Sequence, residues 1–176
     1  LIEDHDLVIV SDYGHGIITS KVAEHISKLV KFVSLNAQVN AANIGLHSIR
    51  KYKNINCLII NADELRHEMR ERDGELLPLA ARLKEIVAAE YITVTLGRAG
   101  AFLLNDGKVP ITCPGFAVDI VDKIGAGDAL LALLSVCLYK GFDEEMALFI
   151  ASLAAAQSVE SIGNSKPVDK VELLKT

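Results

Sequence analysis

The sequence predicts a three-layer α/β/α protein with a mostly parallel central sheet. Short apolar runs alternate with longer segments of helical period, and runs that are apolar on both faces are typical of parallel strands covered on both sides. After the fourth run, the pattern changes to an antiparallel hairpin followed by long helices. No internal repeat, low-complexity tract or proline- or glycine-rich linker divides the 176 residues, so a single α/β domain over residues 1–176 is predicted.

Residues 6–96 of the predicted domain alternate between strands and helices. Residues 6–11 (DLVIVS) are predicted to form a buried strand, and residues 20–31 place four aliphatic side chains on one face of a helix. By the same criteria we predict strands at 32–35, 57–60 and 91–96, and helices at 41–52, 62–72 and 75–89.

The rest of the chain, from residue 101, is predicted to begin with a hairpin. An Asp-Gly pair within residues 105–108 is a strong turn signal between apolar runs at 101–104 and 109–113. Long helices follow at 129–140 and 144–160, with a short one at 169–174.

Composition excludes several classes of protein. The net charge of −5 disfavours a nucleic-acid surface, and no apolar run reaches the roughly 18 residues that a membrane span needs. The chain shows no signal peptide, and its missing initiator methionine suggests a processed or partial chain. Three cysteines without paired spacing predict buried free thiols in a reducing cytoplasm, and five dispersed histidines disfavour a zinc site.

Ligands collect at the carboxyl ends of the strands in such a sheet, so the loops after residues 10, 35, 60, 96 and 121 are the places to look for chemistry. The richest of them is Gly125-Ala126-Gly127-Asp128, preceded by Asp122. Two glycines before a helix let backbone amides converge on an anion such as phosphate. A helix entry capped by Asp128 is the competing interpretation, but it explains neither the glycines nor Asp122. A carboxylate within reach of an attacking hydroxyl could act as its base.

The segment DKIGAGDALLALL resembles the C-terminal signature of the PfkB (ribokinase-like) carbohydrate kinases. The resemblance implies that Asp128 is the catalytic base and that the amides of Gly125, Ala126 and Gly127 form an anion hole. The resemblance also implies a monovalent-cation site at Asp122, although this chain has Lys123 where the family often has threonine.

Two more segments resemble family motifs in family order. Asn61-Ala62-Asp63-Glu64 is similar to NxxE, which implies that Asn61 and Glu64 serve the nucleotide and that Glu64 acts through water on the magnesium that accompanies ATP. Helix capping is the other interpretation. The segment TLGRAG, residues 95–100, is similar to a turn that contacts nucleotide phosphates, implying roles for Thr95, Gly97 and Gly100.

Residues 154–157, of which the first three are alanines, and the exit at Gly163 and Asn164 match the place where the family holds adenine. Tight helix packing explains the small residues equally well.

The amino-terminal part resembles one subgroup. Ser11-Asp12-Tyr13-Gly14-His15-Gly16 is similar to SDYGKG of the heptose 7-phosphate kinases, the kinase half of ADP-heptose synthase, and implies a substrate-side role for Asp12 and Gly14. An ordinary turn is the alternative. Asn36 follows the next strand on the substrate side, but its neighbours depart from the DPK-like segment of that subgroup.

We therefore expect an ATP- and magnesium-dependent sugar kinase without its N-terminal strands and lid, so the chain alone should phosphorylate sugar poorly. The alternatives are a heptose 7-phosphate kinase and a non-catalytic nucleotide-binding module. Expected partners are a sugar and a nucleotide, with no nucleic acid or membrane; a homodimer and a fusion to a nucleotidyltransferase domain stay open.

Overall fold

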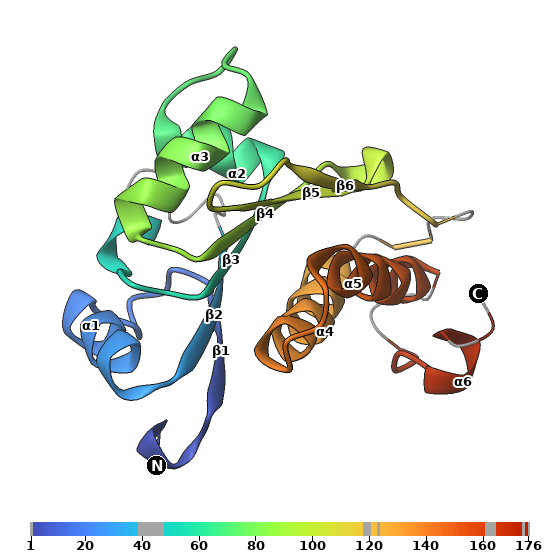
Figure 1. Ribbon diagram of the computed structural model, residues 1–176, viewed down its shortest axis with the longest axis horizontal. Helices are drawn as coiled ribbons and strands as arrows, with labels where there is room; N and C mark the ends of the chain where they lie inside the picture. Colours follow the sequence, from blue (N-terminus) through green and yellow to red (C-terminus); the bar gives the residue numbers. More distant parts are fainter. Residues whose placement is uncertain are drawn as a thin grey trace. The chain divides into compact units, whose positions relative to one another are not determined.

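The computed structural model describes residues 2–38, 48–117, 121–122, 124–160, 165–173 and 175 (Figure 1). Six strands form one sheet in the order β1-β2-β3-β4-β5-β6, parallel from β1 to β4 and antiparallel from β4 to β6. The strands are β1 (Leu7–Asp12), β2 (Phe32–Ala37), β3 (Cys57–Asn61), β4 (Tyr91–Thr95), β5 (Ala101–Asn105) and β6 (Ile111–Cys113). The predicted mostly parallel sheet with a late hairpin is confirmed.

The chain folds into two compact units. Unit 1 comprises Leu1–Thr95 and Leu103–Pro110, and unit 2 comprises Leu96–Phe102 and Ile111–Thr176. The organisation of the chain as one domain stays a prediction.

Unit 1 is built on the parallel strands. Strand β2 is buried along its whole length, because both faces of a central parallel strand are covered. In the described residues of this unit the strands are accompanied by the α-helices α1 (Ser20–Leu29), α2 (Ala62–Met69) and α3 (Leu76–Val87). The unit's core contains the fully buried side chains of Leu35, Leu58, Ile60, Leu83 and Ile92. The buried runs that predicted these strands therefore occupy the core.

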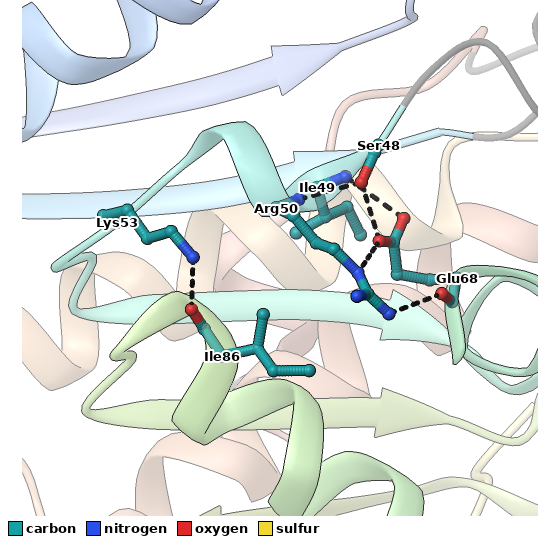
Figure 2. A network of polar contacts seen from close by, with 6 residues as sticks. All are labelled: Ser48, Ile49, Arg50, Lys53, Glu68 and Ile86. Carbon is teal, nitrogen blue, oxygen red and sulfur yellow. Dashed lines mark hydrogen bonds and ion pairs between the residues drawn. The ribbon is translucent and has the colours of Figure 1, made fainter.

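The predicted helix at 41–52 is the clearest difference from the sequence interpretation. Residues 41–47 lie outside the described part, and the remainder forms only a short 3-10 turn, η2 (Ile49–Lys51). The buried Glu68 side chain in α2 accepts hydrogen bonds from the Ser48 hydroxyl, the Ile49 amide and Arg50 Nε, at 2.8, 3.1 and 3.0 Å (Figure 2). Lys53 reaches the carbonyl of Ile86 at the end of α3 (Figure 2). These long-range bonds hold residues 48–53 as an irregular connection.

Unit 2 contains a pair of long helices. Helix α4 (Ala126–Tyr139) and α5 (Glu144–Val159) pack against each other, and α5 also contacts β6. Asp143 caps α5 by accepting from the amides of Glu145 and Met146. Short helices complete the described chain: η1 (Ile2–Asp4), η3 (Gly97–Ala99) and α6 (Lys170–Leu173).

Helix α4 begins three residues earlier than predicted. Its N-cap is Gly125, with φ 90° and ψ −14°, and Asp128 consequently lies in the first turn. Glycine reaches this left-handed conformation without the steric cost of a side chain. Asp128 is therefore not the N-cap, and the capping interpretation of this residue was wrong.

All three cysteines are free and buried, as predicted. Burial raises the pKa of the Cys57 thiol to about 12, with a smaller contribution from the charge of Glu90, so this thiol stays protonated. No helix in the described ranges combines the length and apolar character that crossing a bilayer requires.

Candidate functional site

The register of the parallel strands places predicted site residues of unit 1 in rows. Asn61 and Thr95, both predicted to serve the nucleotide, are direct partners at the ends of β3 and β4. Asn36 lies in the row of Ser11 and Ile59, two residues before the Asn61 row and on the same face. The sheet therefore gathers Asn36, Asn61 and Thr95 on one face near the carboxyl ends of its strands.

Asp12 belongs to the next row of β1, opposite Ala37. Because side chains alternate along a strand, Asp12 lies on the other face from Asn36. The two residues predicted for the substrate side are thus separated by the sheet. Asn36 is itself buried, and its Nδ2 donates to the carbonyl of Ile59 at 2.9 Å, which fixes the orientation of its amide.

Asn61 and Glu64 form a reciprocal capping box at the start of α2. The Glu64 amide donates to Asn61 Oδ1 at 2.8 Å, and the Asn61 amide donates to Glu64 Oε2 at 3.1 Å. The Glu64 side chain is buried, at 8% exposure. This box accounts for both residues as helix-capping groups and also holds the Glu64 carboxylate in a defined orientation.

Asp12 is the centre of a buried polar cluster. Its Oδ1 accepts from the Gly14 amide at 2.9 Å, and its Oδ2 accepts from the Tyr52 hydroxyl at 2.7 Å and pairs with Lys51 Nζ at 2.6 Å. Burial would raise the pKa of the Asp12 carboxyl, but the hydrogen bonds from Lys51, Tyr52 and Gly14 outweigh it and hold this pKa below its ordinary value. Asp12 is therefore a carboxylate at neutral pH.

The turn that carries Gly97 and Gly100 belongs to unit 2. The Leu96 amide donates to the Gly100 carbonyl at 2.7 Å, and both glycines have positive φ, 61° and 94°. A Cβ at Gly100 would lie 2.0 Å from the Cys113 carbonyl oxygen, and one at Gly115 would lie 2.6 Å from the Arg98 carbonyl oxygen. Gly100 is required because two backbone segments cross here with no room for a side chain.

The N-terminus of α4 offers amides that the N-cap does not satisfy. Gly125 makes no side-chain capping bond, since it has no side chain. The first amides of a helix have no acceptor within the helix, and their partial positive charge favours an anion. A Cβ placed on Gly127 would meet nothing within 4 Å, and the Asp128 side chain is exposed. This end of the helix has room for a ligand group.

Asp122 makes hydrogen bonds on both sides of the chain just before α4. Its Oδ1 accepts from the Ile124 amide at 3.0 Å, and the amides of Val121 and Asp122 donate to the Val159 carbonyl at the end of α5. Val121 and Asp122 are thus tied to the end of α5. Gly163, Asn164 and Lys123, which the sequence interpretation also singled out, lie outside the described residues.

The residues most plainly missed from the sequence are Lys51 and Tyr52. Both were assigned to a helix, and no motif or spacing connects them to Asp12, about forty residues away. Gly115 was also missed, although a glycine shortly after a hairpin is a signal for close backbone approach. Across the described ranges, no three His, Cys, Asp or Glu side chains gather as a metal-ligand group.

The fold matches solved sugar kinases. Arabidopsis thaliana ribokinase, solved with ribose and ATP, matches with a TM-score of 0.77 and 24% identity, over 99% of this chain and 56% of that chain. Escherichia coli phosphofructokinase-2, solved with potassium, matches with a TM-score of 0.80 and 14% identity, over 96% and 55%. The predicted three-layer ribokinase-like fold is thereby confirmed.

The model of the pfkB family carbohydrate kinases matches residues 18–171, and the chain belongs to this family. Curated relatives agree. The bifunctional protein HldE of Desulfatibacillum aliphaticivorans is 33% identical over 96% of this chain, and HldE of Campylobacter jejuni is 32% identical over 93%. The chain spans about a third of the length of these relatives, 34% and 35%. The family predicted from the GAGD segment is confirmed.

Proposed function

We propose that the protein containing this chain transfers the γ-phosphoryl group of ATP to a hydroxyl of a sugar or sugar phosphate. Membership of a carbohydrate kinase family supports this reaction class, and the open N-terminus of α4 beside Asp128 is the observation that carries it. Among the acceptors, the relatives named HldE favour heptose 7-phosphate, which is the substrate in the heptose 7-phosphate kinase alternative.

In the proposed reaction Asp128 accepts the proton of the attacking hydroxyl. Its exposed carboxylate, in the first turn of α4, is available to a substrate without first breaking a buried ion pair. The O–H bond of the acceptor breaks as its oxygen bonds to the γ-phosphorus, and the bond from phosphorus to the ADP oxygen breaks. A carboxylate in this role contributes roughly 10²- to 10⁴-fold to the rate.

The amides of Gly125, Ala126 and Gly127 are proposed to stabilise the charge on the transferring group. Charge stabilisation by fixed backbone dipoles requires no reorganisation during the reaction. Gly127 suits this role because its missing side chain leaves the approach to the amides open.

Glu64 fits a magnesium role through water. Magnesium binds proteins through one or two carboxylates and keeps several waters, and the capping box holds this carboxylate in place. The ion, bound with the nucleotide, would neutralise phosphate charge. We also propose nucleotide contacts from Asn61, Thr95, Gly97 and Gly100, from Gly163 and Asn164, and a monovalent cation near Asp122.

Replacement of Asp128 by Asn tests the proposal. We expect kcat to fall at least about a hundredfold, while ATP binding measured by calorimetry and the free energy of unfolding stay close to wild type. A variant that keeps near-normal kcat would refute Asp128 as the base. A protein that binds ATP but phosphorylates no member of a sugar panel, heptose 7-phosphate included, would instead be a non-catalytic nucleotide-binding module.

A further inference from the structure

The loop at residues 13–17 is held at both ends by one cluster. At its start, the Asp12 carboxylate accepts from the Gly14 amide. At its end, Lys51 Nζ donates to the carbonyl of Ile18 at 2.7 Å while pairing with Asp12. Asp12 and Lys51 together therefore close the loop, and the Tyr52 hydroxyl adds a third bond to the same carboxylate.

The cluster is buried, whereas the loop that it closes is exposed. Asp12 is 4% exposed and Tyr52 is completely buried. In contrast, Tyr13 and Ile17 are 46% and 85% exposed, and His15 is exposed with its ring 6.4 Å from that of Tyr13. Large exposed side chains on a loop that a buried cluster holds in place favour a role in contacting a ligand.

Both oxygens of Asp12 are already engaged with groups of the protein. A substrate hydroxyl that bonded to this carboxylate would have to displace Lys51, Tyr52 or the Gly14 amide. Loss of one partner from a buried charged network costs more than an exposed hydrogen bond returns.

The segment that supplies Lys51 and Tyr52 is itself anchored. Ser48 and Arg50 bond to Glu68 on α2, and Lys53 bonds to the end of α3 (Figure 2). Since α2 also begins with the Asn61–Glu64 box, one anchored connection supports both the 13–17 loop and the helix that presents Glu64.

We propose that Asp12, Lys51 and Tyr52 form a clamp that fixes the 13–17 loop for the acceptor substrate, and that Asp12 is a positioning residue rather than a substrate ligand. The exposed side chains of Tyr13, His15 and Ile17 then carry the contact with the acceptor. The contact of this loop with an acceptor rests on the proposed kinase function, whereas the clamp itself rests only on the bonds among Asp12, Lys51 and Tyr52.

The Tyr52→Phe variant is the sharpest test, because Tyr52 is too buried to touch a substrate and the change removes only a hydroxyl. In the full-length protein, we expect amide hydrogen exchange to increase in residues 13–18, while the buried strands stay protected. We expect KM for the acceptor to rise about five- to tenfold, with kcat and KM for ATP within about twofold of wild type.

Lys51→Gln should raise the same exchange rates and the same KM. Lys51→Arg should keep both close to wild type, because a guanidinium can still donate to Asp12. Lys28→Gln is the matched control, since it breaks an exposed ion pair with Glu24 and should change neither readout. Unchanged exchange in residues 13–18 in both Tyr52→Phe and Lys51→Gln would overturn the clamp.

Two kinetic outcomes separate this inference from the proposed function. If Asp12→Asn raises KM for the acceptor while Tyr52→Phe and Lys51→Gln do not, Asp12 contacts the acceptor directly and the positioning role is refuted. If no sugar is phosphorylated by the wild type, the proposed function fails, and the exchange measurement alone still decides whether the clamp exists.

Discussion

Asn61 and Glu64 bond to each other twice, each side chain accepting from the other's backbone amide across the first turn of α2. A structural cap and a proposed magnesium residue therefore coincide in one carboxylate. The two roles can be separated because the cap needs an acceptor oxygen, whereas attraction of a cation needs the charge.

Glu64→Gln keeps an acceptor oxygen and removes the charge. We expect the free energy of unfolding to fall by less than about 1 kcal/mol, whereas the magnesium concentration needed for half-maximal turnover rises at least about tenfold. Asn61→Ala is the matched comparison and should cost about 1 kcal/mol through loss of the cap. Unaltered magnesium dependence in Glu64→Gln would leave Glu64 with the capping role alone.

Gly100 and Gly97 should respond differently to alanine. At Gly100 the new Cβ meets the Cys113 carbonyl at 2.0 Å in a positive-φ conformation, so Gly100→Ala should destabilise by about 3 kcal/mol or more. Gly97→Ala has the positive φ but open space, and should cost about 1 kcal/mol. Denaturant unfolding measures both. Equal costs would mean that the two backbone segments do not cross as closely as described.

Gly127→Ala should separate stability from activity. Alanine is the better helix former by about 1 kcal/mol, and its methyl group would enter open space, so the variant should be as stable as wild type or more so. The same methyl group would obstruct a phosphoryl group above the α4 amides, so turnover should fall at least about tenfold. Full activity combined with the gain in stability would argue against the anion hole.

The Asp12 carboxylate should make stability depend on pH on the acid side. Its pKa is below the ordinary value of 3.8 in the folded state, so its contribution is fully present above that value and is lost as pH falls through the folded pKa. Asp12→Asn should therefore be less stable than wild type at pH 7, by about 2–4 kcal/mol, because Lys51 loses its partner. The difference should shrink below about pH 4. A difference that does not change with pH would show that the charge of Asp12 is not responsible.

Free thiols should be inert in the folded protein. With its pKa at about 12, Cys57 has almost no thiolate at pH 8, and its side chain is completely buried. We expect mass spectrometry to find alkylation of Cys57 only after unfolding. Labelling of the native protein at this cysteine would reveal local opening of β3.

Local patterns in the sequence determined the strands, most helices, the Asp-Gly hairpin and the family. Buried runs and helical periods act over a few residues, so they can be recognised without knowing what they pack against. The GAGD segment was recognisable for the same reason, because converging amides and a nearby carboxylate are properties of neighbouring residues. The cytoplasmic location, the homodimer and the fused domain stay predictions.

Only the tertiary structure decided how distant residues meet. It replaced the described end of the 41–52 helix by a short turn, because bonds to Glu68, Asp12 and Ile86 outweigh local helical preference. It placed Asp12 and Asn36 on opposite faces, since a shift of one residue in a strand reverses the side-chain direction. It also showed why Gly100 must be glycine, because the carbonyl that excludes a side chain belongs to residue 113.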